Sequence, residues 1–124
     1  MFFRTYFPKA EYLGLDISKE SIDVARDRNI DNVEFASYDG IDLPLDDRFF
    51  DITFIASVLH HVKSDSHRRV LEEAKRVLRL GGRRLYIFEH YPFNLVTRRI
   101  VRDCPFDDNA VLLKPAYASA SSRK

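Results

Sequence analysis

The stretch that decides the fold is residues 50–62, which read Phe-Asp-Ile-Thr-Phe-Ile-Ala-Ser-Val-Leu-His-His-Val. Residues 52–55 are β-branched or aromatic at every position and do not alternate with polar residues. This pattern is typical of a strand that is buried on both faces of a parallel sheet. Ala56 and Ser57 follow where the strand ends. Because ligands of open α/β sheets bind at the carboxyl ends of the strands, we expect a ligand beside these two residues.

Helical and strand-like segments alternate on both sides of this stretch. Helical patterns are expected in residues 2–7, in the segment that Ser18 caps and in residues 70–78, which Gly81 and Gly82 terminate. Further short apolar strands are expected in residues 12–15, 33–36 and 85–88. The alternation predicts an α/β fold with a mostly parallel sheet and right-handed crossovers.

The pattern weakens beyond residue 89. A short helix is expected in residues 95–101, and residues 110–113 form a brief apolar patch. The Ala/Ser/Arg/Lys tail, residues 114–124, has a composition typical of disorder. We therefore expect one partial domain over residues 1–113.

Composition narrows the classes of function. The 124 residues include 20 basic and 19 acidic side chains, so no global field favours nucleic acid or an anionic membrane. The single cysteine, Cys104, excludes an internal disulfide and fits a reducing cytosol. No apolar run approaches the roughly 20 residues of a membrane span. These features predict a cytoplasmic protein.

Carboxylates stand at the ends of several expected strands. Asp16 follows the strand of residues 12–15, where an acidic side chain can accept both hydroxyl hydrogens of a ribose. Asp39 lies one helix–strand unit later, precedes Gly40 and is placed to bind an adenine amino group. Glu89 ends the strand of residues 85–88. Aspartate is also common where any strand turns into a loop, so the pair is more informative than either residue alone.

Four segments together resemble one known family. They are Tyr-Leu-Gly-Leu-Asp-Ile-Ser (12–18), Asp-Gly-Ile-Asp-Leu-Pro-Leu (39–45), residues 50–62, and Leu-Glu-Glu-Ala-Lys-Arg-Val-Leu-Arg-Leu-Gly-Gly (71–82). In this order, over roughly residues 5 to 90, they are similar to the class I S-adenosylmethionine-dependent methyltransferases, and specifically to the type 11 methyltransferase domain. The joint match is far more specific than any single motif.

The resemblance implies a Rossmann-like methyltransferase fold, S-adenosyl-L-methionine as cofactor, and methyl transfer to a small-molecule acceptor at an O, N or C atom. The cofactor-binding residues that it implies are Asp16 for the ribose, Ile17 packing on the adenine, Asp39 with Gly40 at the adenine amino group, and Ala56 and Ser57 near the methionine part. The methyl acceptor itself is not indicated by any motif.

Two departures from the family pattern stand out. Leu80 replaces the proline that usually precedes the two glycines. More importantly, the family has a strand ending in Gly-x-Gly-x-Gly before the first helix, and the four glycines of this chain (14, 40, 81 and 82) lie elsewhere. We therefore expect a sheet without its first, central strand, in a domain truncated at both ends. Unpaired buried backbone groups cost roughly 1–3 kcal/mol each, which predicts a marginal or aggregation-prone isolated chain.

Other polar residues allow two interpretations each. His60 and His61 are candidate acid–base groups near a methyl acceptor, but they equally fit a loop in which they cap local backbone. Metal binding would require further ligands. Arg98, Arg99 and Arg102 either contact an anionic substrate or are simply solvated, and the solvated reading is favoured.

Two other classes of function compete with methyl transfer. A nicotinamide-dependent oxidoreductase would also place Asp16 on a ribose, but Asp39 and the Leu-Arg-Leu-Gly-Gly segment (78–82) argue against it. A non-catalytic remnant or binding module is favoured by the absent glycine loop. Titration with S-adenosylhomocysteine and with NAD would separate the three.

Overall fold

The computed structural model describes residues 2–81, 84–104 and 110–114. The chain divides into two compact units, Met1–Gly40 and Ile41–Lys124, and each is described by itself.

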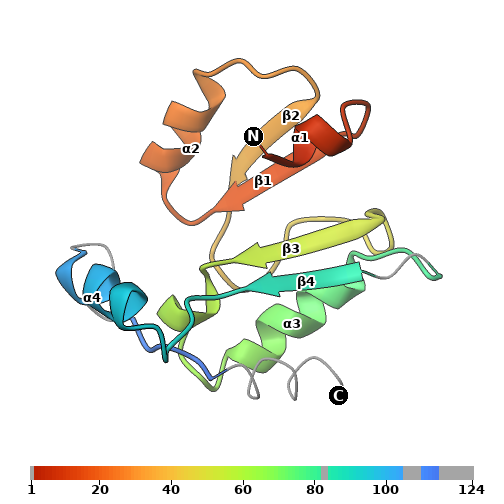
Figure 1. Ribbon diagram of the computed structural model, residues 1–124. Helices are drawn as coiled ribbons and strands as arrows, with labels where there is room; N and C mark the ends of the chain where they lie inside the picture. Colours follow the sequence, from red (N-terminus) through yellow and green to blue (C-terminus); the bar gives the residue numbers. More distant parts are fainter. Residues whose placement is uncertain (1, 82–83, 105–109, 115–124) are drawn as a thin grey trace. The chain divides into compact units, whose positions relative to one another are not determined.

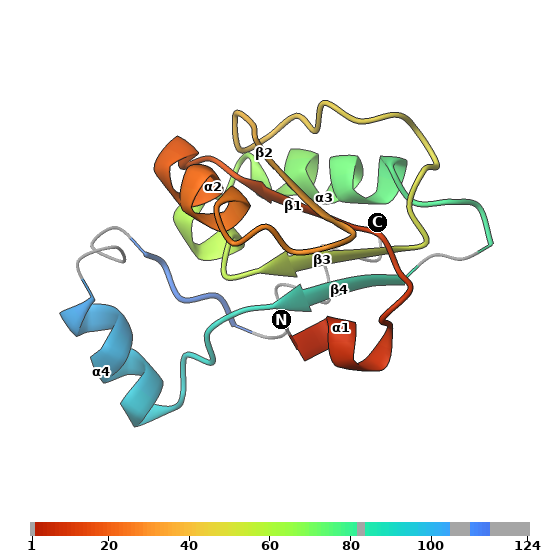
Figure 2. The same cartoon turned by 90° about the horizontal axis from the view of Figure 1, so that it is seen from above.

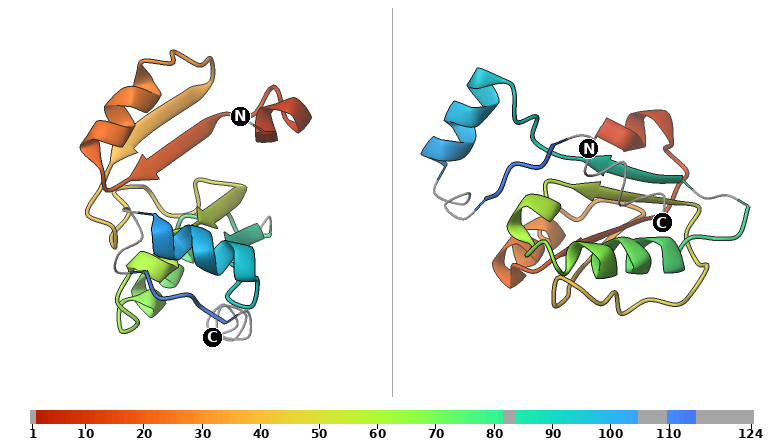
Figure 3. Two further views of the ribbon diagram at one scale, coloured as in Figure 1. Left: turned by 60° about the vertical axis from the view of Figure 1, so that its left-hand side comes forward. Right: turned by 90° about the horizontal axis from the view of Figure 1, so that it is seen from below.

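The first unit is a parallel strand pair with one covering helix (Figures 1 and 3). Its elements are α1 (Phe2–Tyr6), β1 (Tyr12–Asp16), α2 (Lys19–Arg26) and β2 (Val33–Ser37). The two strands run parallel, with Tyr12 opposite Val33 and Asp16 opposite Ser37. Ile22 of α2 is the buried hydrophobic residue of this unit, at 3% exposure, among the residues described here. These elements agree with the expected ones to within a few residues.

Local chemistry explains how the first unit begins and ends its helix. Ser18 is the N-cap of α2, as predicted, and its side chain accepts a hydrogen bond from the Ser21 amide at 3.1 Å. The helix ends at Arg26, and Asn29 beyond it adopts a left-handed conformation, with φ of 42°. Gly14 of β1 is needed for close packing, because a Cβ there would lie 2.6 Å from the ring of Phe35 on β2.

The second unit is a β–α–β arrangement followed by a further helix (Figure 2). Its elements are β3 (Ile52–Ala56), the 3-10 turn Leu59–His61, α3 (His67–Arg76), β4 (Arg84–Phe88) and α4 (Leu95–Asp103). Strands β3 and β4 run parallel, with Ile52 opposite Arg84 and Ala56 opposite Phe88. Helix α3 lies along one face of this pair, and α4 lies beyond the carboxyl end of β4 (Figures 1 and 2).

The core of the second unit lies between α3 and one face of the β3–β4 pair. Its buried residues are Ile55, Leu59, Val70, Leu71 and Ala74, and Leu85 and Ile87 of β4 pack against them. On the opposite face the rings of Phe54, Tyr86 and Phe88 stack with centroids 5.4–6.5 Å apart, and all three are exposed. The prediction that residues 52–55 are buried on both faces is therefore wrong for this chain. Only the positions that face α3 are covered.

Helix α3 ends earlier than its sequence pattern predicts. Val77 and Leu78 continue the apolar spacing and are buried, but the helix ends at Arg76 with Val77 as its cap. The backbone turns there because the Val77 carbonyl accepts from the amides of Phe49 and Phe50, and the Arg79 amide donates to the Phe50 carbonyl. The segment thus pairs with the chain that enters β3. Gly82, expected to help terminate the helix, lies outside the described residues.

Among the described residues, the strands form two parallel pairs, β1–β2 and β3–β4, rather than one four-stranded sheet. This arrangement agrees with the expectation of a partial, parallel fold.

The C-terminal part of the described chain is mostly irregular. Helix α4 extends two residues beyond the expected 95–101, and Asn94 caps it by accepting from the amides of Val96 and Thr97. Arg99 and Arg102 both pair with Asp103 on its surface. Residues 110–114 have no regular secondary structure. Of the tail expected to be disordered, residues 115–124 lie outside the described part.

Candidate functional site

The first unit brings its two predicted carboxylates to the same edge. Asp16 is the last residue of β1, and Asp39 lies two residues beyond β2. The Tyr38 amide donates to the Asp16 carbonyl at 3.2 Å, which ties the two strand ends together. The Asp16 side chain is exposed, and its Oδ1 accepts from the Ser18 amide at 2.8 Å.

The pKa of the Tyr38 phenol is affected by both carboxylates. Burial raises its pKa, and the negative charges of Asp16 and Asp39 raise it further, because each disfavours a second anion nearby. Both aspartates therefore lie close enough to act on one hydroxyl group.

An apolar surface lies beside these carboxylates. Gly40 has φ of 91°, a conformation that suits glycine, and a Cβ at this position would come within 2.9 Å of Ile17 Cγ2. Ile17 is in contact with the Gly40 backbone and yet is 67% exposed. The four residues predicted for the adenosine part, Asp16, Ile17, Asp39 and Gly40, thus lie within one unit and close together.

The second unit contains the other predicted residues, in a turn after β3. Ala56 and Ser57 are both exposed, and Ser57 adopts a left-handed conformation with φ of 54°. Its amide donates to the Phe88 carbonyl at 2.8 Å. A left-handed serine is uncommon and persists where the surrounding structure holds it.

Glu89, the next residue after Phe88, holds the same turn from its other side. Its Oε1 accepts from the amides of Val58 and Leu59 at 3.1 and 2.8 Å, and its Oε2 lies 2.6 Å from His60 Nδ1. From the sequence, Glu89 is predicted to lie at the end of a strand, but the sequence indicates no role for its carboxylate.

The two predicted histidines occupy different environments. His60 is 2% exposed, and its carbonyl accepts from the Val111 amide at 2.9 Å. His61 is exposed, and its ring centroid lies 4.1 Å from that of His60. Within the described ranges, no group of three or more His, Cys, Asp or Glu side chains is arranged to hold a metal ion.

His67 is a residue of this region that sequence reasoning missed. Its Nε2 lies 2.8 Å from the carbonyls of both Leu59 and Val62, so it fastens the far end of the turn. A single histidine at the start of an amphipathic helix carries no signal in the sequence that would have identified this contact.

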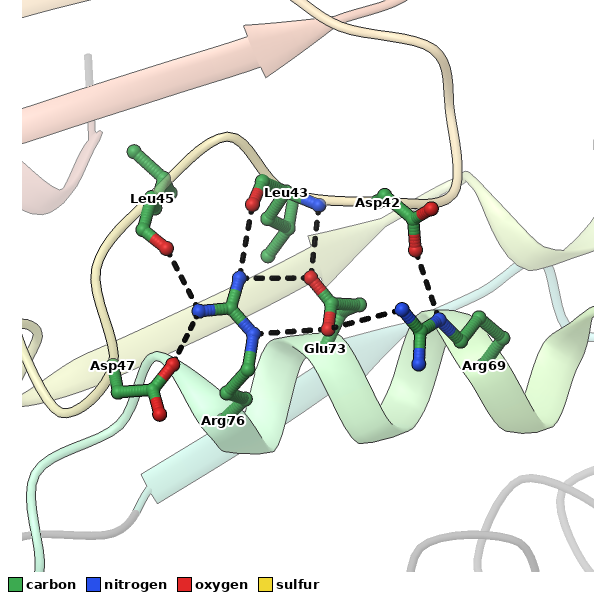
Figure 4. A network of polar contacts seen from close by, with 7 residues as sticks. All are labelled: Asp42, Leu43, Leu45, Asp47, Arg69, Glu73 and Arg76. Carbon is green, nitrogen blue, oxygen red and sulfur yellow. Dashed lines mark hydrogen bonds and ion pairs between the residues drawn. The ribbon is translucent and has the colours of Figure 1, made fainter.

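The loop after Gly40 is fixed to α3 by a buried ion pair (Figure 4). Glu73, only 5% exposed, accepts from Arg76 Nε and Nη2 at 2.9 and 2.8 Å and from the Leu43 amide at 3.0 Å. Arg76 also donates to the carbonyls of Leu43 and Leu45 and to Asp47. The hydrogen bonds from Arg76 lower the pKa of the Glu73 carboxyl, and Glu73 in turn raises the pKa of Arg76.

The type of domain follows from a match to a known protein family. A family model described as a methyltransferase domain matches residues 2–86. The chain belongs to this methyltransferase family.

Relatives and solved structures agree with the assignment. The methyltransferase domain is 37% identical over 75 residues to 27-O-demethylrifamycin SV methyltransferase from Amycolatopsis mediterranei, covering 56% of this chain and 27% of the relative. It is 35% identical over 100 residues to a ubiquinone/menaquinone biosynthesis C-methyltransferase from Ectopseudomonas mendocina, covering 75% and 38%. The chain thus spans about a third of the length of the curated relatives it matches.

Structural similarity defines the fold. A SAM-dependent methyltransferase from Thermotoga maritima, described as a possible histamine N-methyltransferase, superposes with a TM-score of 0.74 at 21% identity, covering 92% of this chain and 61% of the other. The methyltransferase domain described here therefore has the Rossmann-like α/β fold, in partial form. None of the helices in the described part of the chain has the length and apolar character needed to cross a bilayer.

Proposed function

We propose that this methyltransferase domain binds S-adenosyl-L-methionine and takes part in methyl transfer to a small-molecule acceptor. The observation that carries the proposal is the convergence of Asp16, Ile17, Asp39 and Gly40 at one edge of the β1–β2 pair. Two carboxylates beside an exposed apolar side chain provide the chemistry that an adenosine requires.

Each residue of the first unit has a role that follows from its chemistry. Asp16, at the end of β1, accepts hydrogen bonds from the ribose hydroxyls, since an ionised carboxylate accepts but does not donate. Asp39 accepts from the adenine amino group. Ile17 packs against the adenine ring, and Gly40 leaves room for Ile17 to do so.

The turn of the second unit is assigned to the methionine part. Ala56 and Ser57 are exposed at the carboxyl end of β3, the edge at which ligands of this fold class bind. When bound, S-adenosyl-L-methionine supplies a methyl group on a positively charged sulfur that leaves readily. The residues of the chain therefore contribute mainly by holding and orienting the ligand.

His61 is the histidine proposed for proton transfer. It is exposed, whereas His60 is buried and engaged with Glu89. An acceptor that reacts through O–H or N–H must lose a proton, and the ring nitrogen of an exposed imidazole can accept it.

The acceptor is proposed to be a small molecule, because the relatives described above are a 27-O-demethylrifamycin SV methyltransferase and a C-methyltransferase of ubiquinone/menaquinone biosynthesis. The near balance of charge across the chain does not favour a nucleic-acid acceptor. A cytoplasmic location is part of the proposal, since the single cysteine fits a reducing compartment.

Isothermal titration tests the proposal. We expect S-adenosylhomocysteine to bind and NAD not to bind. Asp16→Asn should weaken S-adenosylhomocysteine binding about 10-fold or more, because charge-assisted hydrogen bonds to the ribose are lost. Asp23→Asn is the matched control, since Asp23 is an exposed aspartate of the same unit that pairs with Arg26 at 3.8 Å. Heat with NAD alone would indicate an oxidoreductase, and heat with neither ligand would indicate a non-catalytic module.

A further inference from the structure

The carboxylate of Glu89 contacts three nitrogen atoms. Its side chain is 9% exposed, accepts from the amides of Val58 and Leu59 at 3.1 and 2.8 Å, and lies 2.6 Å from His60 Nδ1. A carboxylate so far from water is stable only when its oxygens are satisfied. The two amides lie at the start of the 3-10 turn, where backbone donors have no partner within the turn itself. The carboxylate and the turn therefore depend on each other.

The end of β4 and the residue that follows it hold Ser57 in place. The Phe88 carbonyl accepts from the Ser57 amide, and the adjacent Glu89 side chain accepts from the next two amides along the turn. Ser57, with φ of 54°, lies between these two attachments. Three consecutive amides, Ser57 to Leu59, are thus held by Phe88, the last residue of β4, and by Glu89 directly after it, and this accounts for a left-handed serine at the position.

His60 is part of the same set of contacts around Glu89. Its ring meets Glu89 on one side, and its carbonyl accepts from the Val111 amide on the other. At 2% exposure it has little surface to offer a substrate.

We propose that Glu89 is the positioning residue of the methionine side of the site, and that His60 acts with it rather than as an acid–base group. In this role Glu89 does not contact the ligand itself. It holds the turn so that Ala56 and Ser57 present a fixed surface. The inference rests on the proposed function for the identity of the ligand, but the contacts of Glu89 are independent of it.

The proposal predicts a selective defect. In Glu89→Ala, the amides of Val58 and Leu59 lose their acceptor, and the turn should loosen. Affinity for S-adenosylhomocysteine should fall about 10-fold or more, while affinity for adenosine, which lacks the amino-acid part, should change by less than about twofold. Glu89→Gln keeps one acceptor oxygen and the shape of the side chain, and its loss should be smaller but equally selective.

Isothermal titration of the full chain with both ligands measures these affinities, and hydrogen exchange of the Val58 and Leu59 amides measures the turn directly. Glu72→Ala is the matched control: Glu72 is an exposed glutamate of α3 that pairs with Arg68 at 2.8 Å. We expect faster exchange at both amides in Glu89→Ala and no change in Glu72→Ala. If Glu89→Ala does not fold, Glu89→Gln carries the same comparison.

Equal losses for both ligands would show a general structural role and overturn the proposal, as would unchanged binding. A wild-type chain that binds neither ligand would contradict the proposed function instead. In that case exchange still decides the role of Glu89: unchanged exchange in Glu89→Ala overturns it, and faster exchange supports its hold on the turn.

Discussion

The two units of the chain hold their candidate ligand residues in opposite ways. In the first unit, Asp16 and Ile17 are exposed at the end of a two-stranded pair, and Ile22 is the single buried hydrophobic residue found among its described positions. In the second unit, the turn after β3 is attached at nearly every residue and rests on a continuous core. The buried hydrophobic residues of the second unit are Ile55, Leu59, Val70, Leu71, Ala74, Val77, Leu78 and Val101.

This difference indicates how each unit keeps its own candidate ligand residues in shape. Burial of apolar surface is the main source of stability, at about 25 cal/mol per Å². The second unit therefore has the means to hold a preformed turn, whereas the first must rely on helix caps, one strand pair and any bound ligand. We expect amide exchange to be slower in the second unit than in the first.

The largest expected effect tests the second unit. In Glu73→Ala, Arg76 and the Leu43 amide lose a buried acceptor, and leaving a buried donor without its partner costs about 1–3 kcal/mol. Urea unfolding of the variant measures this loss. In the first unit, Asp23→Ala removes an exposed pair with Arg26 and should cost under about 0.5 kcal/mol. Comparable losses in both variants would remove the contrast between the units.

The pH dependence of stability sharpens the same contrast, with a smaller effect. The hydrogen bonds from Arg76 lower the folded-state pKa of Glu73 below its ordinary 4.5. A depressed folded pKa means that the stabilisation is complete above the unfolded pKa and is lost as pH falls through the folded one. Unfolding free energies measured from pH 6 downward should therefore fall in the wild type, and fall less steeply in Glu73→Gln.

Glu20 provides the matched control for this loss of stability at low pH. Its pKa is also lowered, by backbone hydrogen bonding and by Ser18, but it lies exposed in the first unit. Water screens such contacts, so Glu20→Gln should leave the pH profile close to that of the wild type. If the pH dependence of the unfolding free energy changes as much in Glu20→Gln as in Glu73→Gln, the loss of stability at low pH is not caused by Glu73.

What the sequence could predict was local. Strand β3 with its small-residue end and the Ser18 cap follow from side chains within a few positions of one another. The same holds separately for Asp16 at the end of β1 and for Asp39 just beyond β2. The end of α3 could not be predicted, because Val77 and Leu78 keep the helical apolar spacing while their backbone pairs with Phe49 and Phe50, some 28 residues earlier.

What the sequence could not predict depends on contacts between distant segments. Glu89 meets Val58, Leu59 and His60 across 29–31 residues, and Glu73 meets Leu43 across 30. On its own helix, Glu73 looks like one more charge on an amphipathic surface, and only the loop that covers it makes it a buried ion-pair partner. Burial of residues 52–55 on both faces was predicted from an apolar run without alternation, but exposure depends on what covers each face.

The smallest expected effect asks whether the two units unfold separately. Ser18→Ala removes the acceptor that caps the Ser21 amide at the start of α2, a loss of about 1 kcal/mol. Ser18→Asp keeps a capping oxygen and should restore most of it. Because the first unit has little buried apolar surface, we expect faster amide exchange in α2 and β2 of Ser18→Ala, with exchange in α3 and β4 unchanged. If protection falls equally in α3 and β4, the chain unfolds as one cooperative block. The weak cap of the first unit and the buried network of the second would then both contribute to one free energy of unfolding for the whole chain.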